Sequence, residues 1–231
     1  MTKCTVLNYD NGSLNDQLDS FFKTLLEKKV IDALMIPMDQ RYGGVKQTLI
    51  TSPENCKGVN PFAPVMPVNS AKLASSLTAQ PSGKRIGLVL RSCEERALIE
   101  LAKLKQADFS DTLIFGFDCL GRYENSDYNS FTEQGGTTEQ FLEKSIKGDG
   151  DFSDMEIASA CKICEFPSTQ TCDLQLGVVG SESGQLIIEV VSEKGQECLE
   201  EGDFSLTEVP ASRGVEIKKL RAARIEERDK L

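Results

Sequence analysis

Two cysteines separated by two residues, Cys161 and Cys164, are the part of this sequence best suited to chemistry. A Cys-x-x-Cys pair places two sulfurs on one tight turn, where both thiolates can bind the same metal ion or iron–sulfur cluster. Two ligands complete neither kind of site, so further thiolates must come from elsewhere in the chain. The other cysteines of the sequence are Cys4, Cys56, Cys93, Cys119, Cys172 and Cys198.

Two of these cysteines each follow a short apolar run that is predicted to be a buried strand. Cys93 comes after Ile86 to Leu90, and Cys119 comes after Leu113 to Phe117. The segment between the runs, Glu94 to Lys105, has helical periodicity. Strand, helix and strand of these lengths indicate a βαβ crossover with two parallel neighbouring strands. Both cysteines should then lie just past the carboxyl ends of adjacent strands, where sites assemble in open α/β sheets.

Several chemistries are compatible with thiolates at Cys93, Cys119, Cys161 and Cys164. All-thiolate ligation suits a [4Fe-4S] cluster, with Cys172 as an alternative ligand, and it also suits a structural zinc ion. The ligand set alone does not separate these two. A thiol–disulfide pair at Cys161 and Cys164 is a third alternative, although a proline-containing loop follows it instead of a thioredoxin-like context. Unrelated buried thiols are a fourth.

The remaining cysteines are expected to take no part in a site. Cys56 lies in a loop rich in Pro, Gly and Asn and is predicted to be an inert surface thiol. Cys4 and Cys198 have no other cysteine close to them in the sequence and are predicted to be inert as well.

Composition excludes several classes of function. The 231 residues contain no histidine, which excludes histidine-based acid–base catalysis and histidine-ligated zinc or iron within this chain. The net charge of −10 disfavours nucleic acid and anionic membrane surfaces as partners. The sequence shows no apolar run of the ~20 residues that a membrane span needs and no signal-peptide core, so a cytoplasmic location is expected. In that compartment, eight cysteines indicate metal or redox chemistry rather than a disulfide framework.

The elements around the cysteines predict an α/β fold with a mixed, partly parallel sheet flanked by helices, a C-terminal β-hairpin and a terminal helix. A single domain over residues 1–231 is expected, with a sub-division near residue 150 as the alternative: an α/β part over 1–150, and the Cys-x-x-Cys loop, hairpin and C-terminal helix over 151–231. The other predicted elements are a helix from Ser13 to about Lys29, a strand from Val30 to Ile36, a short strand at Leu49 to Thr51, helices over Asn69 to Leu77 and Glu139 to Ile146, a hairpin of Leu174 to Val179 with Gln185 to Val191, and a solvated helix from Glu216 to Leu231.

Several segments resemble a known family, the beta subunit of coenzyme F420-reducing hydrogenases and of related formate dehydrogenases. The stretch Cys161 to Gly177 resembles the family's Cys-x-x-Cys segment, which ends in Ala-Asp-Ile/Leu-x-x-Gly. Leu90 to Leu98 is similar to its Pro-Cys-Gln/Glu-x-x-Ala-Leu turn, and Gly116 to Cys119 is similar to its Gly-x-x-Cys. Further likenesses are Gly177 to Gly184 with its hairpin, Ser192 to Glu197 with its Glu-Lys-Gly-x-Glu turn, and Asn11-Gly12-Ser13 with its Gly-Gly helix start.

The resemblance implies cofactors as well as a fold. It implies a [4Fe-4S] cluster on four thiolates and a flavin, FAD, that exchanges single electrons with the cluster and a hydride with a soluble deazaflavin carrier. The protein would then be a subunit of a larger complex that connects a hydrogenase, formate dehydrogenase or heterodisulfide-reductase-type partner to the carrier. The residues implied are Cys93, Cys119, Cys161 and Cys164 for the cluster, and Gly12, Ser13, Ser70 and Lys72 for the flavin.

The sequence departs from the family pattern at three quoted positions. Asn11 replaces a glycine, Cys172 stands where alanine is usual, and Val178 replaces a common acidic residue. These departures concern the flavin and the electron acceptor more than the cluster. The alternative function is therefore a non-catalytic subunit that carries a [4Fe-4S] cluster and relays electrons or docks partners, without a substrate site of its own.

Overall fold

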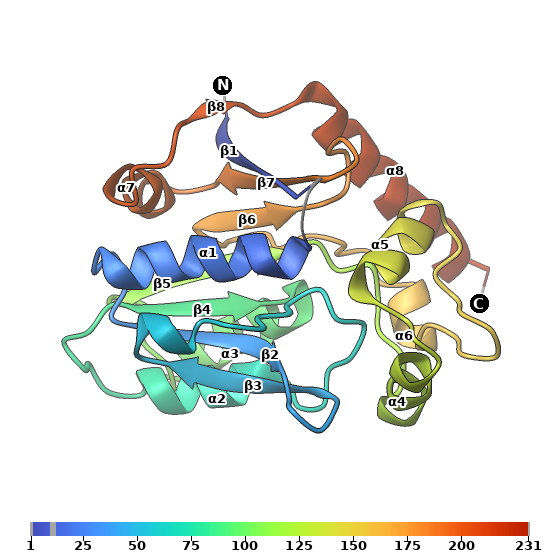
Figure 1. The fold of residues 1–231 in the computed structure, drawn as a ribbon, viewed down its shortest axis with the longest axis horizontal. Helices are drawn as coiled ribbons and strands as arrows, with labels where there is room; N and C mark the ends of the chain where they lie inside the picture. Colours follow the sequence, from blue (N-terminus) through green and yellow to red (C-terminus); the bar gives the residue numbers. More distant parts are fainter. Residues whose placement is uncertain (1, 10–12, 231) are drawn as a thin grey trace.

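Four parallel strands, β2, β4, β5 and β6, form the centre of the fold (Figure 1). The computed structural model describes residues 2–9 and 13–230. Within this part, eight strands make one mixed sheet in the order β3-β2-β4-β5-β6-β7-β1-β8, antiparallel at β3 and from β7 to β8. The strands are β1 (Lys3–Asn8), β2 (Ala33–Asp39), β3 (Val45–Ile50), β4 (Ile86–Leu90), β5 (Thr112–Phe117), β6 (Leu174–Gly177), β7 (Gln185–Val190) and β8 (Thr207–Glu208).

Helices cover both faces of the central strands, which explains why those strands are apolar throughout. Along β4, Val89 packs with α1 on one face, whereas Leu88 packs with α2 and α3 on the other. The helices are α1 (Leu14–Glu27), α2 (Ser70–Thr78), α3 (Ser92–Lys103), α4 (Asn125–Glu133), α5 (Thr138–Ile146), α6 (Ser159–Lys162), α7 (Glu193–Glu201) and α8 (Ala211–Arg228), with a 3₁₀ turn η1 (Pro53–Asn55).

The predicted βαβ crossover is confirmed. Strands β4 and β5 are parallel neighbours, with Leu90 opposite Gly116 at their carboxyl ends. Helix α3 begins at Ser92, so Cys93 lies in its first turn rather than in the loop before it. Helices α4, α5, α6 and α8 gather beyond this end of the sheet (Figure 1).

The C-terminal hairpin is also confirmed, as the antiparallel pair β6 and β7. The N-terminal strand β1 lies between β7 and β8, so strands from before and after residue 150 share one sheet. Sequence analysis did not predict β1, Lys3–Asn8.

Several predicted element boundaries need correction. The strand after α1 begins at Ala33, because Val30 and Ile31 donate backbone hydrogen bonds to Leu25 O and close the end of α1. Strand β3 is longer than predicted and spans Val45–Ile50. The Ser192 to Glu197 turn is the cap and first turn of α7, with Ser192 Oγ accepting from Gly195 N.

Two further corrections concern Cys56 and the C-terminal helix. Cys56 is 5% exposed and belongs to the core beneath α1, so it is a buried thiol and not a surface one. Helix α8 begins at Ala211, directly after Pro210, and it is docked rather than simply solvated, because Arg213 and Arg224 are buried. None of the helices in the described residues is long and apolar enough to cross a membrane.

Candidate functional site

The Cys-x-x-Cys segment forms a tight turn at α6. Cys161 lies in this single-turn helix, and Cys164 N donates to Cys161 O at 3.3 Å, which folds the two cysteines onto one turn. The turn is fixed at its start by Ala158 N, which donates to Arg122 O at 2.8 Å. Lys162, between the two cysteines, forms ion pairs with Asp151 and Glu156 at 3.2 and 2.9 Å.

Hydrogen bonds join this turn to the ends of β4 and β5. After β5, Cys119 N donates to Pro167 O at 2.7 Å, three residues beyond Cys164. After β4, Ser92 Oγ donates to Phe166 O at 2.6 Å, and Ser92 immediately precedes Cys93. The three segments that carry Cys93, Cys119 and the Cys-x-x-Cys pair therefore meet at one end of the sheet.

Arg224 adds a further link from α8. Its Nη2 donates to Cys119 O at 3.1 Å and its Nη1 to Cys164 O at 3.4 Å. One guanidinium thus binds the backbone carbonyls of two cysteines that lie 45 residues apart in the chain.

The thiols are also close enough to influence one another. The pKa of Cys93 is raised to about 12, chiefly by burial, with Cys119, Glu94 and Cys161 adding to the rise and Arg91 opposing it. Burial likewise raises the pKa of Cys161, with Cys119 adding to the rise and the charges of Arg122 and Arg91 opposing it. Two arginine side chains therefore provide positive charge where negative thiolates would gather.

Burial separates these four cysteines from the rest. Cys93, Cys119, Cys161 and Cys164 are half-buried free thiols, whereas the other four cysteines are buried. Cys172 packs in the core under α2 and α3 and its sulfur accepts a 3.0 Å hydrogen bond from Thr169 Oγ1. Burial raises its pKa to about 11. The structure thus buries the alternative ligand, with its sulfur already hydrogen bonded to Thr169.

The donor set consists of four free thiols, the ligand type that suits an iron–sulfur cluster. Among the described residues, no three Cys, Asp or Glu side chains stand close enough together to hold one metal ion. A tetrahedral zinc site needs four thiolates converging on one atom. A [4Fe-4S] core instead takes one thiolate at each of four irons, so its ligands stand farther apart than those of a single ion.

The residues implied for the flavin lie on two faces of the sheet. Ser13 caps α1 by accepting from Asp16 N at 3.0 Å, and the next residue, Leu14, packs in the core on the α1 face. Ser70 begins α2, and the next residue, Ala71, packs on the opposite face. Lys72 is exposed, and Gly12 lies outside the described residues. Ser13 and Ser70 thus begin helices on opposite faces of the sheet.

Ser70 lies at a pocket of about 240 Å³ that sequence reasoning did not identify. Ser70 N and Oγ donate to Glu94 Oε1 at 2.9 and 2.6 Å, and Arg91 N donates to Glu94 Oε2 at 2.9 Å. Arg91 Nη2 donates to Ala63 O and Val65 O at 2.8 and 2.7 Å. The pocket's other lining is mostly apolar: Pro37, Val45, Val65, Met66, Pro67, Val68 and Leu73, with Lys46 and Gln47.

This pocket adjoins the cysteines through α3. Arg91 and Glu94 line it and flank Cys93 in the sequence. An apolar slot with a few converging polar groups is typical of cofactor sites. Sequence reasoning missed Arg91 and Glu94 because their partners, Ser70 for Glu94 and the carbonyls of Ala63 and Val65 for Arg91, lie more than 20 residues away in the chain.

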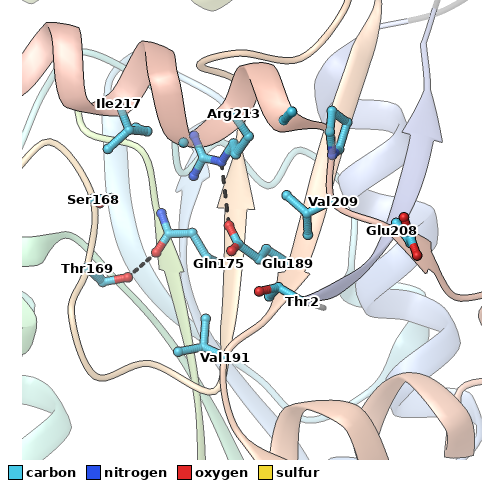
Figure 2. Close-up of a pocket in the computed structure, with 13 residues that line it drawn as sticks. Thr2, Ser168, Thr169, Gln175, Glu189, Val191, Glu208, Val209, Arg213 and Ile217 are labelled. Carbon is cyan, nitrogen blue, oxygen red and sulfur yellow. Dashed lines mark hydrogen bonds and ion pairs between the residues drawn. The ribbon is translucent and has the colours of Figure 1, made fainter.

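A second pocket, of about 610 Å³, lies under the start of α8 and contains none of the cysteines (Figure 2). Thr169, Gln175 and Glu189 form its polar wall, and Arg213 lies over them from α8. Thr169 is hydrogen bonded to Gln175, whose Nε2 donates to Asp118 Oδ1 at 3.1 Å. This polar network reaches Asp118, directly before Cys119, and so belongs to the support of the cysteine site.

Known proteins resemble this chain in both sequence and fold. Residues 83–211 match the family model for the C terminus of the coenzyme F420 hydrogenase/dehydrogenase beta subunit. The chain is also 23% identical over 242 residues to the F420-dependent formate dehydrogenase subunit beta of Methanocaldococcus jannaschii, in an alignment that covers 90% of this chain and 62% of that protein. The chain thus spans less than two thirds of the length of that relative.

The fold is similar to that of a chain in the F420-reducing [NiFe] hydrogenase complex from Methanosarcina barkeri. The TM-score is 0.67, and the match covers 100% of this chain and 90% of that chain at 16% sequence identity. At that identity the likeness shows the fold alone.

Proposed function

The chain belongs to the coenzyme F420 hydrogenase/dehydrogenase beta-subunit family, and from this premise we propose that it is an iron–sulfur flavoprotein subunit of a larger redox complex. It connects a hydrogenase, formate dehydrogenase or heterodisulfide-reductase-type partner to a soluble two-electron carrier, which in this family is the deazaflavin coenzyme F420. It acts in the cytoplasm, where thiols stay reduced and available to iron.

One observation carries the proposal. The cysteine-bearing segments after β4, after β5 and at α6 are hydrogen bonded to one another through Ser92, Cys119 and Arg224. A purely structural fold has no need to gather four free, half-buried thiols from three distant segments. That gathering supports cluster ligation by Cys93, Cys119, Cys161 and Cys164.

The chain's own residues would prepare the site for an anionic group. When bound, the cluster would supply one-electron transfer. Arg91 and Arg122 offset the negative charge of the four thiolates, and both act on the Cys161 thiol. Cys93 lies in the first turn of α3 after β4, Cys119 follows β5, and Cys161 and Cys164 share one hydrogen-bonded turn, which supports binding of one group by all four.

The pocket beside Ser70 is proposed as the flavin ring site. Its apolar walls suit a planar aromatic ring, and Arg91 and Glu94 connect it to Cys93 within the first turn of α3. When bound, the flavin would convert between single electrons and a hydride. Ser70 and Lys72 would serve from α2, whereas Ser13 caps α1 on the other face of the sheet.

Composition of one anaerobic preparation tests this proposal. Purified full-length protein is assayed for iron, acid-labile sulfide and flavin, and its visible absorption is recorded. Iron–sulfur and flavin bands together support the proposed function, and reduction of the deazaflavin carrier by the reduced protein then tests the substrate. Iron–sulfur absorption without flavin would instead support a relay subunit with no substrate site. Colourless protein that contains zinc would overturn the proposal.

A further inference from the structure

We propose that helix α8 is a clasp for the iron–sulfur site, in which Arg224 positions two cluster-binding loops and raises the reduction potential of the cluster. This inference rests on the proposed function, because it concerns the same four cysteines. The helix begins at Ala211, where the match to the family model ends. Its role is therefore not part of the matched region.

Every arginine of α8 contacts a residue at, or next to, one of the four cysteines. Arg224 binds the carbonyls of Cys119 and Cys164. The other three contacts are Arg213 with Asp118, immediately before Cys119, and Arg221 and Arg228 with Glu165, immediately after Cys164.

The spacing of the helix puts these contacts on one side. Arg213 and Arg224 are eleven residues apart, which is close to three full turns. Ile217 and Leu220 stand between them at helical spacing, and both pack against the main core. The four residues make one stripe that is apolar in the middle and cationic at each end.

The burial of Arg213 and Arg224 shows that these two side chains hold α8 against the rest of the protein. Across the described residues of α8, the two buried side chains are Arg213 and Arg224. A terminal helix that merely covers apolar surface would bury its isoleucine and leucine and leave its arginines in water. Here Arg224 is 8% exposed, and the partners that its guanidinium meets are the two cysteine carbonyls.

Two physical consequences follow from this placement. The fork of donors on Arg224 fixes the separation of the Cys119 and Cys164 backbones before any iron is bound. A positive charge held in a water-poor site also favours the more negative state of a neighbouring group. One-electron reduction makes a thiolate-bound cluster more negative, so Arg224 stabilises the reduced form and raises the potential.

The test compares Arg224→Gln with Lys219→Gln in the full-length protein. Both variants remove one positive charge from α8, but Lys219 is exposed and pairs with Glu216 on the same helix. Iron and sulfide per chain are measured, the midpoint potential is read from a redox titration followed by electron paramagnetic resonance, and circular dichroism of the cluster-free protein checks the fold. Arg224→Gln is expected to lower the potential, or to lose iron, while Lys219→Gln stays close to wild type.

Equal potentials and equal iron content in the two variants would overturn the inference. A wild-type protein without iron and sulfide would instead overturn the proposed function, and the inference with it. If circular dichroism shows that Arg224→Gln is unfolded, the exposed pair Arg221→Gln/Arg228→Gln is compared with Lys218→Gln/Lys219→Gln. A more negative potential in the arginine pair is then expected, and an equal potential overturns the inference.

Discussion

Asp118 and Arg213 form a bidentate ion pair in the interior, with Nη1 to Oδ2 at 2.6 Å and Nη2 to Oδ1 at 2.8 Å. Their side chains are 0% and 4% exposed, respectively. Asp118 also accepts from the backbone N–H groups of Val178 and Val179, both at 2.9 Å. This carboxylate therefore joins the end of β5 to the hairpin and to α8, one residue before Cys119.

Removing one partner of this pair should be strongly destabilising. Arg213→Met leaves the Asp118 charge buried with only amide donors, and the loss of one partner of a buried pair costs about 3 to 5 kcal/mol. Urea unfolding measures the change, with Lys219→Met as the control for an exposed charge on the same helix. A loss no larger than that of the control would contradict the importance of the pair.

Glu189 faces the same arginine, but neutralising its side chain should not destabilise the protein. Burial raises its pKa, with Arg213 opposing the rise and Asp118 adding to it. Because the folded-state pKa lies above the unfolded value, the native state takes up the proton first as pH falls, and wild type gains stability on acidification. Glu189→Gln should therefore be at least as stable as wild type at neutral pH.

The advantage of Glu189→Gln should shrink as pH falls through the raised pKa. Urea unfolding at a series of pH values from neutral downward measures the difference in unfolding free energy. A difference that stays constant, or grows on acidification, would show that the carboxylate is not penalised by burial.

Two glycine-to-alanine changes should change the stability of the protein in opposite directions. A Cβ on Gly116 would overlap the Thr169 hydroxyl and approach Gln175 Oε1 at 2.7 Å, so Gly116→Ala must shift the loop that follows the Cys-x-x-Cys turn. Overpacking of this kind costs about 1 to 3 kcal/mol. Gly214 has no atom near its Cβ position and lies in α8, so Gly214→Ala should stabilise by about 0.5 to 1 kcal/mol.

Thermal or urea unfolding of the two variants measures the change in stability that each causes. Iron content should fall in Gly116→Ala, because the displaced loop also holds Cys119 through Pro167 O. Destabilisation by Gly214→Ala would contradict the docked position of α8.

A charge at the mouth of the pocket beside Ser70 should remove flavin without removing iron. Leu73 lines this pocket and is exposed, whereas Leu104 is an exposed leucine that does not line it. Leu73→Glu is expected to lower the flavin content per chain, because binding of the ring would bury a carboxylate against an apolar surface. Leu104→Glu is the matched control. Flavin content that is the same in both variants would place the flavin elsewhere.

The sequence predicted the central part of the fold and the position of Cys93 and Cys119 after neighbouring parallel strands. Continuous apolar runs before Cys93 and Cys119 identified two strands covered on both faces, and their spacing required a parallel crossover. The Gly180 to Gly184 turn between two strand-like runs similarly predicted the β6–β7 hairpin. These features follow from local periodicity and chain connectivity, which a single sequence contains.

The supporting residues could not be predicted, because their partners lie far away in the chain. Arg213 and Asp118 are 95 residues apart, and nothing in the charged pattern of α8 separates Arg213 or Arg224 from a solvated residue. The burial of Cys56 was missed for the same reason, since η1 and the loop after it pack under α1. One signal was present: an aspartate directly before Cys119 needs a buried partner if β5 is central.

The most direct test of the cluster site compares iron in Cys119→Ser and Cys172→Ala, with Cys56→Ala as a second control. Iron and acid-labile sulfide per chain are measured after anaerobic purification of each full-length variant. We predict that Cys119→Ser loses the cluster, whereas both controls keep the wild-type content because their sulfurs are buried in apolar cores. Equal iron in Cys119→Ser and Cys172→Ala, or loss of iron in Cys172→Ala alone, would contradict the assignment of the four ligands.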